Sequence, residues 1–107
     1  MEHSAVINNI KKMAHRVLPT GSSLYLYGSR ARGDWGKHSD WDLLLLVDNP
    51  NLNYKEKEKL EFPFVDMGWD LGEDINARAY TKNQWYNGPH TMFFFNVEQD
   101  KQLLYES

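Results

Sequence analysis

The sequence contains no cysteine, which excludes a disulfide framework and favours an intracellular location. It has no apolar stretch near the roughly 20 residues that span a bilayer. Its N-terminal stretch MEHSAVINNIKKM lacks the apolar core of a secretory signal. Basic side chains are not in excess, since 12 Lys and Arg stand against 15 Asp and Glu. We therefore expect a cytoplasmic protein that enters no membrane and shows no sequence-specific DNA binding.

Repeats, linkers and low-complexity tracts are also absent, and 107 residues suit a single small domain over residues 1–107. Aromatic side chains are frequent, at 14% of the chain with four tryptophans. A domain of this size buries so many rings with difficulty, which indicates a stacking site or a surface for a partner. A core that is simply rich in aromatic residues is the alternative.

The spacing of apolar residues predicts alternating helices and strands. Expected helices cover residues 4–18 with Ser4 as N-cap, then 29–34, 54–60, 62–72 and 91–101, and Thr81 caps a short turn after the third strand. Expected strands cover 23–27, 41–47, 74–80 and the terminal QLLYE segment as an edge strand. The stretch 62–72 favours a helix with Pro63 in its first turn, and a hairpin strand is the alternative. This order predicts an α/β or α+β layer.

A bare Gly-Ser turn follows the first expected strand. Gly28 allows a close approach of the backbone to a ligand, and the Ser29 hydroxyl adds a hydrogen-bond donor. Arg30 and Arg32 place positive charge beside this turn. Together these residues predict a phosphate pocket, although an ordinary turn is the common explanation for Gly-Ser. A short helix leaves room for only some of these arginines to face the pocket, and the other would form a surface ion pair with Asp34.

Two aspartates open the second strand. Asp40 and Asp42 are two residues apart, so in a strand they point to one face while Trp41 points to the other. Neighbouring carboxylates repel each other unless a cation lies between them, and Mg²⁺ is a suitable one. Two capping acids in a solvated turn are the alternative. Leu44 and Leu46 share the face of the aspartates, so they line a cleft or are covered by the C-terminal helix.

The spacing of these two features is more specific than either alone. Ten residues separate Gly28-Ser29 from Asp40-x-Asp42, within the segments GSRARG and SDWDL. This pattern resembles the minimal nucleotidyltransferases of the DNA polymerase beta superfamily, in particular the MNT-type antitoxins. The resemblance implies a polymerase-beta-like nucleotidyltransferase core of α/β (α+β) class. Such a core is a small mixed sheet of three to four strands packed with helices on one face.

The same resemblance implies roles for individual residues. Gly28 and Ser29 would hold the β- and γ-phosphates of ATP or another nucleoside triphosphate. Asp40 and Asp42 would hold two Mg²⁺ ions and act in catalysis. The remaining nucleotide-binding residues that it implies are Arg30, Arg32 and Ser39.

A third acid, expected on the next strand of this family, is replaced here. The matching position is Asn76, whose amide oxygen can bind a metal but carries no charge and is a poor base. Asp74 lies two residues earlier on the same face and ranks first as a catalytic substitute, provided the strand begins early enough. Asp66 and Asp70 become candidates only if residues 62–72 form a hairpin.

Two functions follow from this resemblance. The first is a Mg²⁺-dependent nucleotidyltransferase that moves a nucleoside monophosphate, AMP from ATP, to a hydroxyl on a HEPN-type toxin partner. The second is a catalytically weakened nucleotide-binding or antitoxin module that acts by binding a protein partner. The intact Gly-Ser and Asp-x-Asp elements favour the first, and Asn76 favours the second. A homo-oligomer remains open under both.

Overall fold

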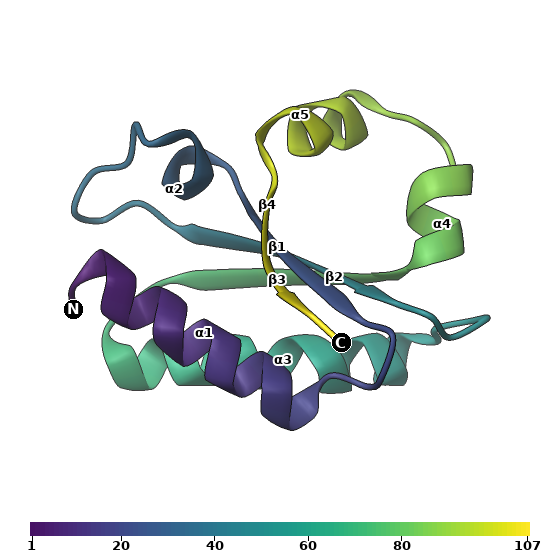
Figure 1. Ribbon diagram of the computed structural model, residues 1–107, viewed down its shortest axis with the longest axis horizontal. Helices are drawn as coiled ribbons and strands as arrows, with labels where there is room; N and C mark the ends of the chain where they lie inside the picture. Colours follow the sequence, from purple (N-terminus) through teal and green to yellow (C-terminus); the bar gives the residue numbers. More distant parts are fainter.

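The computed structural model describes residues 1–107 as one layer of strands between helices (Figure 1). The helices are α1 (His3–Val17), α2 (Ser29–Arg32), α3 (Tyr54–Leu71), α4 (Lys82–Asn87) and α5 (Met92–Asp100). The strands are β1 (Ser23–Tyr27), β2 (Trp41–Val47), β3 (Ile75–Thr81) and β4 (Gln102–Glu106). Their order in the sheet is β3-β2-β1-β4, with β2 and β3 parallel and the other two pairs antiparallel. The expected α+β class with a small mixed sheet is confirmed.

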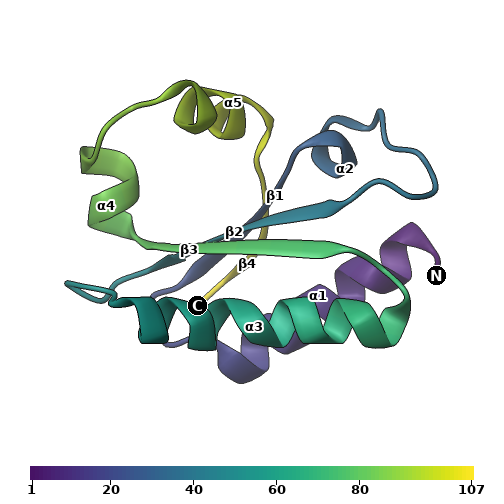
Figure 2. The same cartoon turned by 180° about the vertical axis from the view of Figure 1, so that it is seen from behind.

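The two long helices α1 and α3 lie together against one face of the sheet, as both views show (Figure 2). Their apolar stripes meet the inward-facing side chains of β1 and β2. The main core contains the fully buried Ile10, Leu24, Trp41 and Phe64. Trp41 is therefore fixed on the helix-covered face, which directs its neighbours Asp40 and Asp42 to the other face.

The short helices α4 and α5 cover part of the opposite face (Figure 1). Trp85 of α4 and Val97 of α5 form a second apolar cluster with Leu44 and Leu46 of β2. These two leucines are therefore covered and do not line a cleft. The Asp-x-Asp pair lies beyond the covered part, at the start of the same strand.

The segment 54–71 forms one continuous helix, so the expected break before Pro63 is wrong and the hairpin alternative is excluded. A capping box of Asn53 and Glu56 starts this helix. Pro63 lies in its interior, where it removes one intrahelical hydrogen bond. Burial of Phe64 and Gly68 on the same helix offsets that loss, because tertiary packing outweighs local propensity.

Other boundaries differ from the sequence-based expectations by a few residues. Helix α1 begins at His3 with Glu2 as N-cap, so the expected Ser4 cap is wrong. The His3 ring stacks on Trp35 with centroids 4.6 Å apart, which holds the extra residue in place. Helix α2 ends before Asp34 because Gly33 adopts a left-handed conformation with φ 93°. None of the helices is long and apolar enough to cross a membrane.

Candidate active site

Gly28 lies next to Asp42, where β1 ends and α2 begins. Its φ of 76° and ψ of −159° belong to a backbone region that only glycine adopts readily. A Cβ atom at this position would lie 2.5 Å from Oδ2 of Asp42. Glycine is thus required at position 28 for two reasons: other residues rarely adopt these dihedral angles, and the carboxylate of Asp42 leaves no space for a side chain. Ser29 follows as the first residue of α2.

Asp42 lies between Tyr27 of β1 and Asn76 of β3 in the register of the sheet. The Asn76 side chain joins the two aspartates. Its Nδ2 donates hydrogen bonds of 3.3 Å to Oδ2 of Asp40 and 3.2 Å to Oδ1 of Asp42. The structure thus brings together three of the residues predicted from the sequence, from two neighbouring strands.

The carboxylates of Asp40 and Asp42 have no counter-charge in direct contact, since neither forms an ion pair. Burial raises the pKa of Asp42 above its usual value, and the charge of Asp40 raises it further. The hydrogen bond from Asn76 and the more distant charges of Arg78 and Arg32 lower that pKa in part. A cation between the two carboxylates would relieve the repulsion between them.

The donor set fits a hard divalent cation. Carboxylate and amide oxygens are ligands that Mg²⁺ accepts, and rotation of the Asn76 amide by half a turn presents its oxygen in place of its nitrogen. No group of three or more acidic, histidine or cysteine side chains could hold a metal in this chain. The residues that would hold a cation are therefore Asp40, Asp42 and the amide of Asn76.

The two predicted phosphate-binding arginines have different surroundings. Arg30 is buried, and its guanidinium carbon lies 4.6 Å from the Trp35 ring centroid and 4.3 Å from that of Trp41. It also donates two hydrogen bonds to the carbonyl of Ser39. Because Trp41 points away from Asp42, the structure does not bring Arg30 to the two acids, and its predicted role in nucleotide binding has no support from this position.

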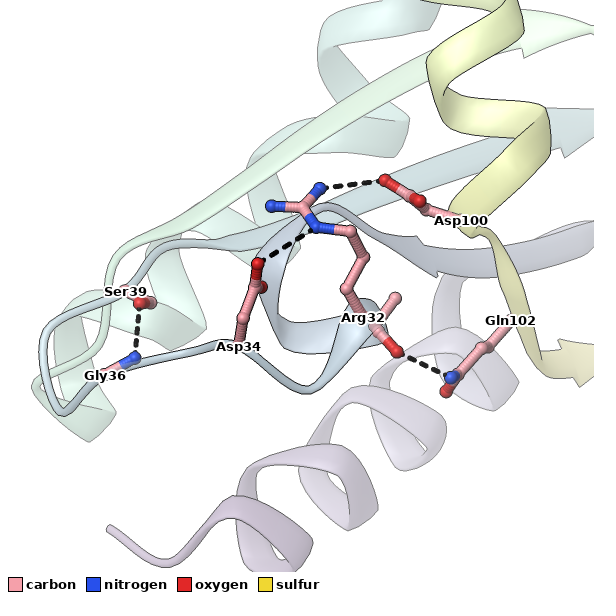
Figure 3. A network of polar contacts seen from close by, with 7 residues as sticks. Arg32, Asp34, Gly36, Ser39, Asp100 and Gln102 are labelled. Carbon is pink, nitrogen blue, oxygen red and sulfur yellow. Dashed lines mark hydrogen bonds and ion pairs between the residues drawn. The ribbon is translucent and has the colours of Figure 1, made fainter.

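Arg32 is the last residue of α2, and its side chain reaches across the surface to the end of α5. Its guanidinium pairs with Asp34 at 3.3 Å, as expected for one of the two arginines, and with Asp100 at 2.8 Å (Figure 3). These ion pairs connect the loop after α2 to the end of α5. Arg32 stays a predicted phosphate ligand. To bind a phosphate, its guanidinium would have to give up an ion pair with Asp34 or Asp100.

Ser39 closes the loop that leads into β2. Its hydroxyl accepts a 2.8 Å hydrogen bond from the backbone N–H of Gly36 (Figure 3). Its carbonyl accepts the two hydrogen bonds from Arg30. These contacts hold the loop just before Asp40. A role for Ser39 in nucleotide binding stays a prediction.

Asp74 lies directly before the first residue of β3. Strand β3 begins at Ile75, one residue later than the sequence predicted. The carbonyl of Asp74 accepts a 2.8 Å hydrogen bond from the N–H of Trp41, so its backbone adjoins the start of β2, and its catalytic role stays a prediction. Asp66 and Asp70 belong to α3, on the far face of the sheet.

Two residues beside the acids were given no role in the sequence analysis. Arg78 lies two residues after Asn76 on β3, is exposed and forms no ion pair. Its guanidinium lies 4.8 Å from the Phe93 ring centroid. Tyr27 lies opposite Asp42, and burial together with the charge of Asp42 raises the pKa of Tyr27 to about 12. The alternation of side chains along β3, starting from Asn76, is the signal that places Arg78 at the site.

The chain matches a protein family and individual proteins of known sequence. Residues 7–90 match the family model described as "Nucleotidyltransferase domain". A bifunctional uridylyltransferase/uridylyl-removing enzyme of Burkholderia thailandensis is 34% identical over 67 residues, and an enzyme of the same description from Burkholderia mallei matches equally. That alignment covers 63% of this chain and 8% of the B. thailandensis enzyme, so the chain corresponds to a small part of that relative.

Solved structures share the fold at low sequence identity. A toxin–antitoxin complex with AMP-PNP superimposes with a TM-score of 0.67 at 20% identity, covering 94% of this chain and 73% of the other. A complex of MNT antitoxin with tri-AMPylated HEPN toxin from Shewanella oneidensis gives a TM-score of 0.63 at 17% identity, covering 99% and 74%. At such identities the likeness establishes a common fold.

Proposed function

Because this chain belongs to the nucleotidyltransferase domain family, we propose that it transfers AMP from ATP to a hydroxyl acceptor with the aid of Mg²⁺. One observation carries the proposal. Asp40 and Asp42 lie on one face of β2, beside the glycine turn, with only a neutral amide between them. Such a pair is costly for the fold unless it serves a cation.

Each group of residues has its own role in the proposed reaction. The turn at Gly28 and Ser29 receives the β- and γ-phosphates, with Arg32 beside it. Asp40, Asp42 and Asn76 would hold Mg²⁺, which when bound stabilises negative charge on the transferred phosphoryl group. The acceptor oxygen forms a bond to the α-phosphorus, the bond from that phosphorus to the bridging oxygen breaks, and pyrophosphate leaves.

The proton of the acceptor hydroxyl has no carboxylate on β3 to receive it, because Asn76 is a poor base. It passes to solvent or to a group of the acceptor protein. Loss of a general base typically costs about 10²–10⁴-fold in rate, whereas positioning and electrostatics carry most of phosphoryl-type transfer. We therefore expect slow but measurable turnover.

A protein hydroxyl on a HEPN-type toxin is the proposed acceptor. The support is the AMP-PNP complex and the tri-AMPylated HEPN toxin among the proteins that share this fold. Use of ATP and a toxin of the same cell would place the reaction in the cytoplasm.

The test is titration of AMP-PNP in the presence and absence of Mg²⁺, followed by transfer of α-labelled AMP to candidate HEPN proteins. Asp42→Asn should weaken Mg²⁺-dependent binding by roughly 100-fold or more, since removing only a hydrogen-bond partner of a metal ligand costs about 10–100-fold. Asp70→Asn, on the exposed side of α3, is the matched control and should bind as the wild type. Equal binding by all three proteins would contradict the proposed site.

A second function is favoured by Asn76 itself. In that case the chain binds nucleotide and partner without transfer, as an antitoxin module. Binding of AMP-PNP together with a stable HEPN complex, but no labelled product after prolonged incubation, would identify this function.

A further inference from the structure

Asn76 carries no charge, so it lowers the negative charge of the site and with it the number of cations that the site can hold. Its amide contacts both Asp40 and Asp42, at 3.3 Å and 3.2 Å, so it occupies the position from which a third carboxylate would act. The site therefore carries two negative charges instead of three. One divalent cation is enough to neutralise them.

A second divalent cation would meet a strong electrostatic penalty. Paired metal sites hold their two ions about 3.5–4 Å apart, where like charges repel strongly. A third carboxylate offsets that repulsion, whereas the neutral oxygen of Asn76 does not. The triphosphate of the nucleotide nevertheless carries more negative charge than one divalent cation neutralises.

Arg78 offers that charge from the same face of the same strand. It pairs with Leu44 in the register of the sheet, two residues further along the strands than the pair of Asp42 with Asn76. Its guanidinium is exposed and rests on the Phe93 ring of α5, with no acidic partner. The other arginine of the site, Arg32, is already paired with Asp34 and Asp100. A guanidinium without a carboxylate is suited to bind phosphate.

The geometry points to a site with one divalent cation and one guanidinium: Asp40 and Asp42 hold the ion, and Arg78 contacts the triphosphate in place of a second ion. This inference rests on the proposed nucleotide site and revises the expectation of two Mg²⁺ ions. It assigns Arg78 to substrate binding. It also gives Asn76 a defined effect, which is to limit the site to one ion.

The first experiment counts cations directly. Equilibrium dialysis with Mn²⁺ and AMP-PNP gives the ratio of protein-bound Mn²⁺ to protein-bound AMP-PNP. We expect a ratio of one for the wild type and two for Asn76→Asp. A ratio of two for the wild type, or of one for both proteins, would overturn the inference and leave the nucleotide site intact. Absence of AMP-PNP binding in both would overturn the proposed function together with it.

The second experiment tests Arg78 by a double-mutant cycle on the dissociation constant of AMP-PNP with Mg²⁺. Arg78→Ala should weaken binding roughly ten-fold or more, as loss of a charged hydrogen bond does. In the Asn76→Asp background the same change should cost less than about three-fold, because the second cation then supplies the charge. Arg16→Ala on α1 is the matched control and should change nothing. Equal losses in both backgrounds would show that Arg78 does not replace a cation.

Discussion

Gly28 lies directly against one of the two aspartates, since an added Cβ would be 2.5 Å from Oδ2 of Asp42. Four glycines have positive φ, but only some of them also lack space for a side chain. At Gly28 the Oδ2 atom of Asp42 occupies that space, whereas at Gly33 no atom lies within 4 Å of the added Cβ. Alanine substitutions at Gly28 and Gly33 therefore separate two costs in folding free energy, that of the positive φ and that of the contact with Asp42.

We expect Gly28→Ala to destabilise the protein more than Gly33→Ala. Gly33→Ala meets the cost of the left-handed conformation, about 1–2 kcal/mol. Gly28→Ala meets a backbone region reserved for glycine and also displaces Asp42, so its cost should exceed that of Gly33→Ala by at least about 1 kcal/mol. Urea unfolding of the two variants measures the difference. Equal midpoints would show that Asp42 moves aside freely.

Strand β3 lies at one edge of the sheet, and helix α3 protects it. Glu61 of α3 accepts a 2.7 Å hydrogen bond from the backbone N–H of Ala79, a fully buried residue of β3. This contact satisfies an edge N–H that would otherwise lack a partner and blocks pairing with another strand. Since β3 carries Asn76 and Arg78, α3 also holds the outer wall of the site in place.

We expect Glu61→Ala to cost about 1–3 kcal/mol, because it leaves the buried N–H of Ala79 without an acceptor. Glu61→Gln retains an acceptor oxygen and should recover most of the stability. Glu58→Ala, an exposed glutamate on the same helix, is the control. Thermal or urea unfolding gives the comparison. A loss in Glu58→Ala equal to that in Glu61→Ala would indicate a general effect of helix charge.

Helices cover one face of the sheet and only part of the other, and this decides the environment of the site. Helices α1 and α3 cover one face, while α4 and α5 lie over part of the other (Figure 2). Tyr27 is covered by this second layer, where its ring meets Phe93 of α5 edge-on at 5.9 Å. Its hydroxyl is thereby held in surroundings that disfavour the tyrosinate.

We expect this burial to appear as a pH dependence of stability. The pKa of Tyr27 rises from 10.0 to about 12 on folding, so the folded state holds the proton more tightly. Its contribution is complete below pH 10 and is lost as the pH rises towards 12, by at most about 2–3 kcal/mol. Tyr27→Phe should remove this part of the alkaline loss. Urea unfolding of both proteins between pH 9 and 12 measures the effect, and parallel curves would contradict it.

Much of the fold and part of the site were predictable because they depend on local chemistry. Strands 23–27 and 41–47 follow from short apolar runs bounded by turn residues, and the Thr81 cap from its capping box with Gln84. The limits of α3 were not predictable from Pro63, because packing against β3 overrides that local signal. The burial of Leu44 and Leu46 was not predictable either, because it depends on packing against helices that are distant in the sequence.

The sequence by itself determined the aspartate pair, the glycine turn ten residues before it and the absence of a third acid at position 76, since these are matters of spacing and residue type. Only the tertiary structure decided how those residues combine. The parallel register of β2 and β3 placed the Asn76 amide on both carboxylates. The Arg30 guanidinium lies over the rings of Trp35 and Trp41. Arg78 lies on the same strand as Asn76 and forms no ion pair. Contacts between distant segments set these outcomes, and the local pattern shows only that Arg78 shares a face of β3 with Asn76.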